Sequence, residues 1–209
     1  MSNKRSYLVR GARQLAALAA ASRQEIVDVL EQMGTVSVAE LAAALDRPAD
    51  ALYFHLRALT RVGLVRKAGA RARPGGEEAL YCTIKPELHL HYEPRNAANR
   101  QAISTIVASM LRLADRDFRR SFDQGQVVVS GAYRELWAWR KVGRLSRAQL
   151  AEVNHRVQDL AQVVSAPLGS GRLYAVTVIL TPLDHRNNVN GSTTRGARKA
   201  RPAKRRKKL

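Results

Sequence analysis

Apolar residues recur at helical spacing in three short segments near the start of the chain. In residues 22–34, 37–46 and 48–61, most of the large apolar side chains fall on one face of a helix. Ser37 and Glu40 also have the S-x-x-E spacing of a capping box, in which the two residues satisfy each other's free backbone N–H groups at a helix start. The pattern predicts three helices, with the second and third joined by a short turn.

Signals at the segment ends support these helices. Ser22 and Glu25 repeat the capping-box spacing, and Gly34 is a typical helix stop. Pro48 suits the first turn of the third helix, where its missing N–H costs nothing. Residues 1–13 are basic and weakly patterned, which predicts a loose arm.

Alternation replaces helical spacing after the third helix. Residues 64–68 and 79–84 are predicted strands, and the sequence between them, GARARPGGEE, has Pro-Gly-Gly turn chemistry. Leu80, Cys82 and Ile84 alternate with other residues, so one face of the hairpin is expected to be covered. The order helix, helix, helix, hairpin is that of a winged helix.

The pattern after the hairpin predicts a small α/β unit of about 90 residues. This size is at the lower limit for an independent core or a dimerising module. After a short strand at residues 88–92 come a long amphipathic helix (95–122), an aromatic strand (135–142), a helix capped by Ser146 and Gln149, and a strand at 173–180. The wide apolar stripe of the long helix needs a partner surface.

The chain is strongly basic. It has 36 Lys+Arg and 17 Asp+Glu, giving a formal net charge of +19. Ten of the basic residues lie in residues 186–209, which contain no acid, so the rest keeps 26 basic and 17 acidic residues, or +9. A polyanionic partner is the simplest explanation. Because residues 186–209 have almost no large apolar side chains, they are predicted to be disordered.

The expected fold class is α+β, with an N-terminal winged helix-turn-helix domain, a small α/β dimerisation or effector domain and a disordered basic tail. The expected boundaries are 1–18 for a basic arm, 19–94 for the winged helix-turn-helix, 95–185 for the second domain and 186–209 for the tail.

The number of cysteines and the hydropathy of the chain indicate the cellular compartment. Cys82 is the one cysteine, so no intramolecular disulfide forms and a reducing compartment is expected. No segment approaches the roughly 20 apolar residues of a membrane span, and no secretory signal is evident. A cytoplasmic location, at the nucleoid, is expected, with no membrane partner.

The third helix has a leucine stripe on one side and long, donor-rich side chains on the other. A short helix of this kind suits the major groove of DNA, with Arg57 reading a guanine. The alternative is a solvated helix face; His55 could contact phosphate or pack, and Asp50 could favour the helix N-terminus. The candidate DNA-binding residues here are Asp50, Tyr53, Phe54, His55, Arg57 and Arg61.

Two further groups of cations are candidates for contacts that position the protein without specifying sequence. Around the hairpin tip these are Lys67, Arg71 and Arg73, which would contact phosphate or the minor groove, or merely solubilise a loop. At the tail they are Lys204, Arg205, Arg206, Lys207 and Lys208, for which a phosphate-binding arm, a nuclear import signal and a solubiliser stay open.

Residues 22–84 resemble the ArsR-type winged-helix transcriptional regulators. The resemblance is carried by SVAELAAAL, by ALYFHLRALTRVGLV and by the return strand ALYCTI. It implies a homodimeric repressor that binds operator DNA. The paired cysteines of the metal-sensing branch are missing, so metal sensing by that route is not implied. LRLADRDF, GRLSRAQLAEVN and LYAVTVILTPL are similar to the C-terminal part of some regulators of this kind.

Other chemistry has little support. His89 and His91 share a strand face, but a closed metal site needs about four ligands, so no metal is expected. Trp137 and Trp139 could line an effector pocket, although closure of a small core is the favoured interpretation. The familiar hydrolase, P-loop, zinc-protease and dinucleotide motifs are missing, so neither an enzyme nor a cofactor is expected.

The sequence therefore predicts a sequence-specific, double-stranded-DNA-binding regulator, a homodimeric repressor that reads an inverted repeat and could respond to a small-molecule effector. The alternative is a nucleoid-associated architectural protein of low specificity. A protein-interaction module on a degenerate winged helix is a third hypothesis.

Overall fold

A computed structural model of the chain describes residues 5–166 and 171–183. It divides into two compact units, residues 1–177 and 178–209. In the second unit, the described residues 178–183 contain no helix or strand. The predicted disordered tail, residues 186–209, lies outside the described residues.

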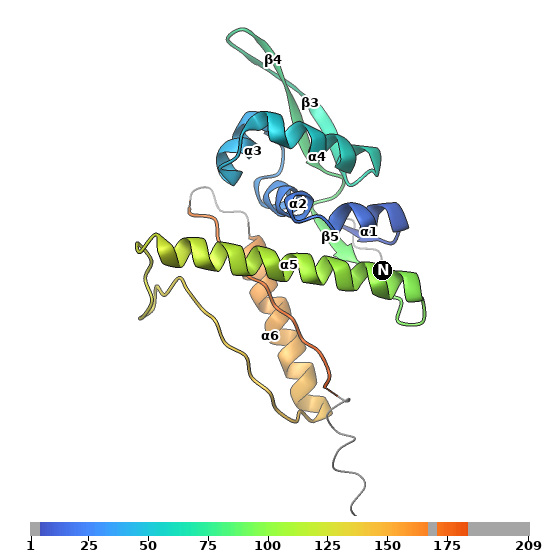
Figure 1. The fold of residues 1–209 in the computed structure, drawn as a ribbon, viewed down its shortest axis with the longest axis vertical. Helices are drawn as coiled ribbons and strands as arrows, with labels where there is room; N and C mark the ends of the chain where they lie inside the picture. Colours follow the sequence, from blue (N-terminus) through green and yellow to red (C-terminus); the bar gives the residue numbers. More distant parts are fainter. Residues whose placement is uncertain (1–4, 167–170, 184–209) are drawn as a thin grey trace, which may run out of the picture. The chain divides into compact units, whose positions relative to one another are not determined.

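The first unit is an α+β structure (Figure 1). Its helices are α1 (Ala12–Leu18), α2 (Ala21–Met33), α3 (Val38–Leu45), α4 (Ala49–Arg61), α5 (Ala97–Asp123) and α6 (Arg147–Ser165). Its strands are β1 (Ser6–Val9), β2 (Val36–Ser37), β3 (Val65–Arg73), β4 (Gly76–Thr83) and β5 (Glu87–Leu90). The predicted order of three helices followed by a hairpin is confirmed for α2, α3, α4, β3 and β4.

The core lies between α2, α3 and α4. The largest fully buried side chains include Ile26 and Leu30 of α2, and Leu41 of α3. The predicted leucine stripe of α4 is confirmed, because its buried residues are Leu52, Leu56 and Leu59. Burying each such leucine stabilises the fold by about 1.5–3 kcal/mol before the entropy cost of ordering it. Ile103 and Ile106 bring α5 into the same cluster.

Three strands form an antiparallel sheet in the order β2-β4-β3, in which β2 precedes α3 whereas β3 and β4 follow α4. β3 and β4 form a long hairpin, the wing, which projects beyond α3 and α4 (Figure 1). The prediction of a ten-residue loop between them was wrong, because the strands continue to the tight turn at Pro74–Gly75.

The expected alternation of buried and exposed residues in β4 was also wrong. Tyr81, Cys82 and Thr83 are consecutive and all buried. This end of β4 is the centre of the sheet, and α2 and α3 also pack against it. Both faces of the strand are therefore covered.

The predicted loose N-terminal arm was wrong. β1 pairs in parallel with β5, with Ser6 opposite Glu87, and Val9 is fully buried. β5 confirms the short strand predicted near residues 88–92. Four residues carry too little pattern to predict a strand whose partner lies about 80 residues further along the chain.

The capping box at α3 is confirmed. Glu40 N donates to Ser37 Oγ at 3.2 Å, and Ser37 N donates to Glu40 Oε2 at 2.8 Å. The similar spacing at Ser22 and Glu25 is not a capping box, because α2 begins at Ala21. Both of those side chains instead bind Arg47.

The predicted C-terminal α/β unit is only partly correct. α5 and α6 are confirmed, including the Ser146–Gln149 capping box. Residues 135–142 and 173–180 form no strand, and α6 has no buried residue. Trp137 and Trp139 are 65% and 70% exposed, so they do not close a core. An extended segment becomes a strand only when another strand pairs with it.

Candidate nucleic-acid interface

α4 presents two chemically different faces. Leu52, Leu56 and Leu59 pack into the core, whereas Tyr53 and Phe54 are 48% and 70% exposed. Asp50, Arg57 and Arg61 are exposed as well. Asp50 lies in the first turn and Arg61 in the last, each at the end of the helix dipole that favours its charge. Of the six α4 residues predicted to contact DNA, all except the half-buried His55 are therefore exposed.

His55 lies at the edge of that set and is half-buried. Its Nδ1 is buried and has no hydrogen-bond partner among the described residues. Burial, with smaller contributions from Arg23 and Arg47, lowers the pKa of His55. The neutral imidazole is therefore favoured at neutral pH. Its ring meets Phe54 edge-on, with centroids 5.5 Å apart.

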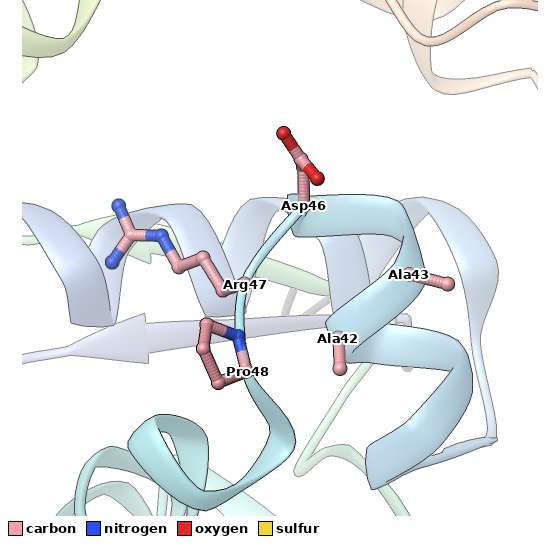
Figure 2. A pocket seen from close by; sticks show the side chains of 5 residues that line it. All are labelled: Ala42, Ala43, Asp46, Arg47 and Pro48. Atoms are coloured by element: carbon pink, nitrogen blue, oxygen red, sulfur yellow. The ribbon is translucent and has the colours of Figure 1, made fainter.

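The turn between α3 and α4 is held by a left-handed residue. Asp46 has a φ of 49° and ends α3, and Pro48 precedes α4. Figure 2 shows a depression here lined by Ala42, Ala43, Asp46, Arg47 and Pro48, with the Asp46 and Arg47 side chains pointing apart. Asp46 pairs with Arg120 of α5.

Ion pairs tie this turn to two helices. Arg47 Nη2 lies 2.5 Å from Glu25 Oε2, and Arg116 Nη2 of α5 lies 2.5 Å from Glu25 Oε1. The carboxylate of Glu25 on α2 therefore joins the turn to α5. These contacts fix the turn that sets the direction of α4.

The wing places its three predicted cations in different environments. Lys67 is exposed, and none of the described residues pairs with it. Arg71 Nη2 lies 2.9 Å from Glu40 Oε1 and 2.6 Å from Glu78 Oε1. Arg73 Nη1 is a looser 3.7 Å from Glu78 Oε2. The side-chain hydrogen bonds to Glu78 and Glu40 raise the pKa of Arg71.

Sequence reasoning missed one exposed cation and two acids in this region. Arg66 is exposed on β3 beside Lys67. It could have been predicted from the basic run RK at the start of the strand. The neutralisation of Arg71 by Glu40 and Glu78 could not, because Glu40 lies on a different element.

The other candidate sites have no comparable geometry. His89 Nε2 lies 3.3 Å from Glu87 Oε2, and His91 Nε2 lies 3.1 Å from Glu93 Oε1, so the two rings face different carboxylates. Residues 5–166 and 171–183 contain no group of three or more side chains placed to hold a metal ion. No helix in those ranges is long and apolar enough to cross a membrane. The predicted contacts at Lys204–Lys208 lie outside the described residues.

A comparison with known protein families shows which kind of domain contains α2, α3 and α4. Residues 18–68 match the family model of a helix-turn-helix domain. No curated protein matches the chain. The matched residues cover α2, α3 and α4 and extend into the start of β3. The helix-turn-helix domain supports a DNA-binding transcription regulator, and domains of this family are typically not enzymes.

Proposed function

We propose that this protein is a sequence-specific transcription regulator of the ArsR-like type, a homodimeric repressor that reads an inverted-repeat operator in double-stranded DNA. The observation that carries the proposal is the division of α4 into a buried leucine face and an exposed polar and aromatic face. This helix is the second of the helix-turn-helix and lies inside the matched residues. In such domains the second helix enters the major groove.

Arg57 is the residue we assign to base recognition. It is exposed near the middle of α4, and none of the described residues forms an ion pair with it. A guanidinium can donate two parallel hydrogen bonds to O6 and N7 of guanine. Tyr53, one turn earlier, would contact the neighbouring base edge or phosphate. Arg61 would reach the backbone from the last turn of α4.

The wing would contact the flanking backbone. Lys67 and Arg66 are free to neutralise phosphates, whereas Arg71 must exchange its two carboxylates for a phosphate. Contacts of this kind add affinity for all sequences and make it dependent on salt. The basic tail would act in the same way.

Two copies are needed for the proposed operator. A two-fold dimer presents two α4 helices, and successive major grooves on one face of B-DNA are about 34 Å apart. Half-sites about one helical turn apart are therefore expected. An effector would regulate the protein only if it bound the DNA-competent and DNA-incompetent states with different affinity.

The test compares Arg57→Ala with Arg112→Ala on selected and random duplexes at one salt concentration. Arg112 is an exposed arginine on α5, so both variants lose the same charge. Operator fragments are first selected from random DNA with the wild-type protein. We expect Arg57→Ala to weaken binding to the selected duplex by about 1–3 kcal/mol and to leave random-duplex binding nearly unchanged. Equal losses on the two duplexes would contradict the role of Arg57.

A nucleoid-type architectural role is the second candidate, favoured by the net charge of +19. Competition by random DNA at physiological salt separates the two. A regulator keeps a preference of about a thousandfold or more for its operator, whereas an architectural protein shows little.

A further inference from the structure

Residues 126–177 expose an unusual amount of apolar side chain. From here on we term this segment the arm, and the word no longer refers to the N-terminal residues or the basic tail. The structure describes 126–166 and 171–177 of this segment. Its large apolar residues that are more than a third exposed are Val128, Val129, Tyr133, Trp137, Trp139, Val142, Leu145, Leu150, Leu160, Val163, Val164, Leu173, Tyr174 and Val176. Tryptophan at 65–70% exposure, as at positions 137 and 139, is costly in water.

The exposed area matches what a stable protein interface needs. One aromatic side chain can bury about 150–250 Å². Fourteen large apolar side chains, each roughly half exposed, therefore leave on the order of 1,000 Å² open to solvent. A standard interface buries about 800 Å² on each partner.

The two extended segments of the arm, on either side of α6, also have an almost unpaired backbone. In residues 126–145 and 171–177, a single backbone-to-backbone hydrogen bond is present, from Glu135 N to Val128 O at 2.7 Å. Extended segments with free N–H and C=O groups are ready templates for strand pairing. The arm therefore needs both apolar cover and strand partners.

Glu135 holds the extended segments in place. Its Oε2 accepts from Val128 N at 2.8 Å, and its Oε1 accepts from Tyr174 Oη at 2.7 Å and Arg172 Nη1 at 3.1 Å. Its side chain is only 16% exposed. One carboxylate thus joins the chain near residue 128 to the chain near residue 173. The arm is pre-organised before any partner binds.

We propose that the arm binds the arm of a second copy, so that extended segments of the two chains pair as strands and their apolar faces cover each other. This deepens the proposed function, which requires two copies, by naming the surface that joins them. A second copy supplies an equal apolar area and equally unpaired backbone. Both deficits of the arm are therefore met by one partner.

Two other occupants fit less well. Single-stranded nucleic acid binds by stacking on aromatic rings. Ten of the fourteen exposed side chains are aliphatic, which cannot stack on bases in this way. A small effector would leave most of the surface uncovered, because drug-sized pockets are about 300–1,000 Å³.

The two tryptophans provide a direct probe, because the chain has no others and both lie on the arm. The experiment uses the full chain without DNA and measures mass by sedimentation, together with tryptophan emission and quenching by acrylamide, over a dilution series. We expect a dimer at tens of micromolar with blue-shifted, protected emission. On dilution, the emission should shift to the red at the concentration at which the mass halves.

Two variants place a charge on the arm at sites that are open in the single chain. Val176 is 50% exposed and Val163, on α6, is 71% exposed, so Val176→Asp and Val163→Asp leave the winged helix intact. Burying a carboxylate in an apolar interface is unfavourable. Both variants should be monomeric, with red-shifted emission. Tyr92→Asp, at a 63% exposed site outside the arm, is the matched control and should remain dimeric.

Three results would overturn the inference: a monomeric wild type throughout the series, a dimer whose tryptophans stay accessible and that survives both aspartate variants, or protection that appears only when a single-stranded oligonucleotide is added. The fate of the proposed function is separate. A dimer joined elsewhere that still prefers its operator keeps that function and removes the arm's role. A dimer joined through the arm that shows no preference between duplexes keeps the arm's role and removes the proposed function.

Discussion

Arg71 Nη2 on the wing lies 2.9 Å from Glu40 Oε1 at the start of α3. Glu40 is also half of the capping box with Ser37, so one side chain both caps a helix of the helix-turn-helix and holds the hairpin. The backbone N–H of Ser37, followed by Arg71, lowers the pKa of Glu40, which keeps its carboxylate charged at neutral pH. The wing is thereby joined to the first helix of the helix-turn-helix in the free protein.

The first prediction concerns Glu40→Gln. Glutamine can still accept from Ser37 N, but it no longer neutralises Arg71. We expect the free energy of unfolding to change by less than about 0.5 kcal/mol, because an exposed ion pair contributes little. Affinity for a random duplex should rise, and its dependence on log salt should steepen by less than about one unit, because Arg71 keeps its second carboxylate, Glu78. Fluorescence anisotropy at several salt concentrations measures both.

Glu77→Gln is the control for that variant, because it removes the same charge from an exposed wing position. Since Glu77 forms no ion pair with Arg71 or with any other described residue, its effect on duplex affinity should be smaller. Equal effects of the two substitutions would mean that net charge alone is responsible.

The second prediction concerns Ser37→Ala. Ser37 is 1% exposed and its Oγ accepts from Glu40 N at 3.2 Å. Removing a helix cap costs about 0.5–2 kcal/mol. We expect chemical denaturation to show a loss in that range. Ser104→Ala, at an exposed position within α5, should be neutral or slightly stabilising, and a similar loss there would contradict the capping argument.

The sequence predicts the local parts of this molecule well. The leucine spacing of α4, the capping boxes at Ser37 and Ser146, and the stop at Gly34 depend only on neighbours in the chain, and all are confirmed. The same leucine spacing determines which α4 side chains are exposed. The exposure of the candidate DNA-binding face was predictable for this reason.

The parts that failed depend on distant partners. β1 forms only because β5 pairs with it. Ser22 and Glu25 have the spacing of a cap but bind Arg47 on another element. Residues 135–142 have the alternation of a strand and no strand to pair with among the described residues. Local pattern states what a segment favours, whereas the tertiary partner decides what forms.

The third prediction is a pH dependence at Glu31. Its Oε1 accepts from Leu88 N of β5 at 2.6 Å. Burial raises the pKa of Glu31 from 4.5 to about 7, and the neighbouring carboxylates Asp28 and Glu87 add to the rise, whereas the bond from Leu88 opposes it. Folding therefore favours the protonated acid. Its contribution to stability is complete below pH 4.5 and is lost as the pH rises through about 7.

Glu31→Gln should remove this dependence, because the amide stays neutral and keeps an oxygen for Leu88 N. At pH 8 we expect the variant to be more stable than the wild type by about 1–3 kcal/mol, and at pH 4 the two should be equal. Urea denaturation at both pH values measures the difference. A variant less stable than the wild type at pH 8 would show that the charged carboxylate is favoured in the fold.

The last prediction separates the two faces of α4. Leu56 is 1% exposed and lies directly before Arg57, so its truncation leaves a cavity in the core without touching the exposed face. Leu56→Ala should cost about 2–5 kcal/mol of unfolding free energy. Leu111→Ala, at a 50% exposed site on α5, should cost far less.

The same variants separate stability from the reading of bases. At a temperature where Leu56→Ala is still folded, its preference for the selected duplex over a random duplex should match that of the wild type. Arg57→Ala should show the opposite result, with normal stability and a reduced preference. If Leu56→Ala lost sequence preference while fully folded, the two faces of α4 would not be independent, and reading of bases would have to involve the packing of the helix as well as its exposed side chains.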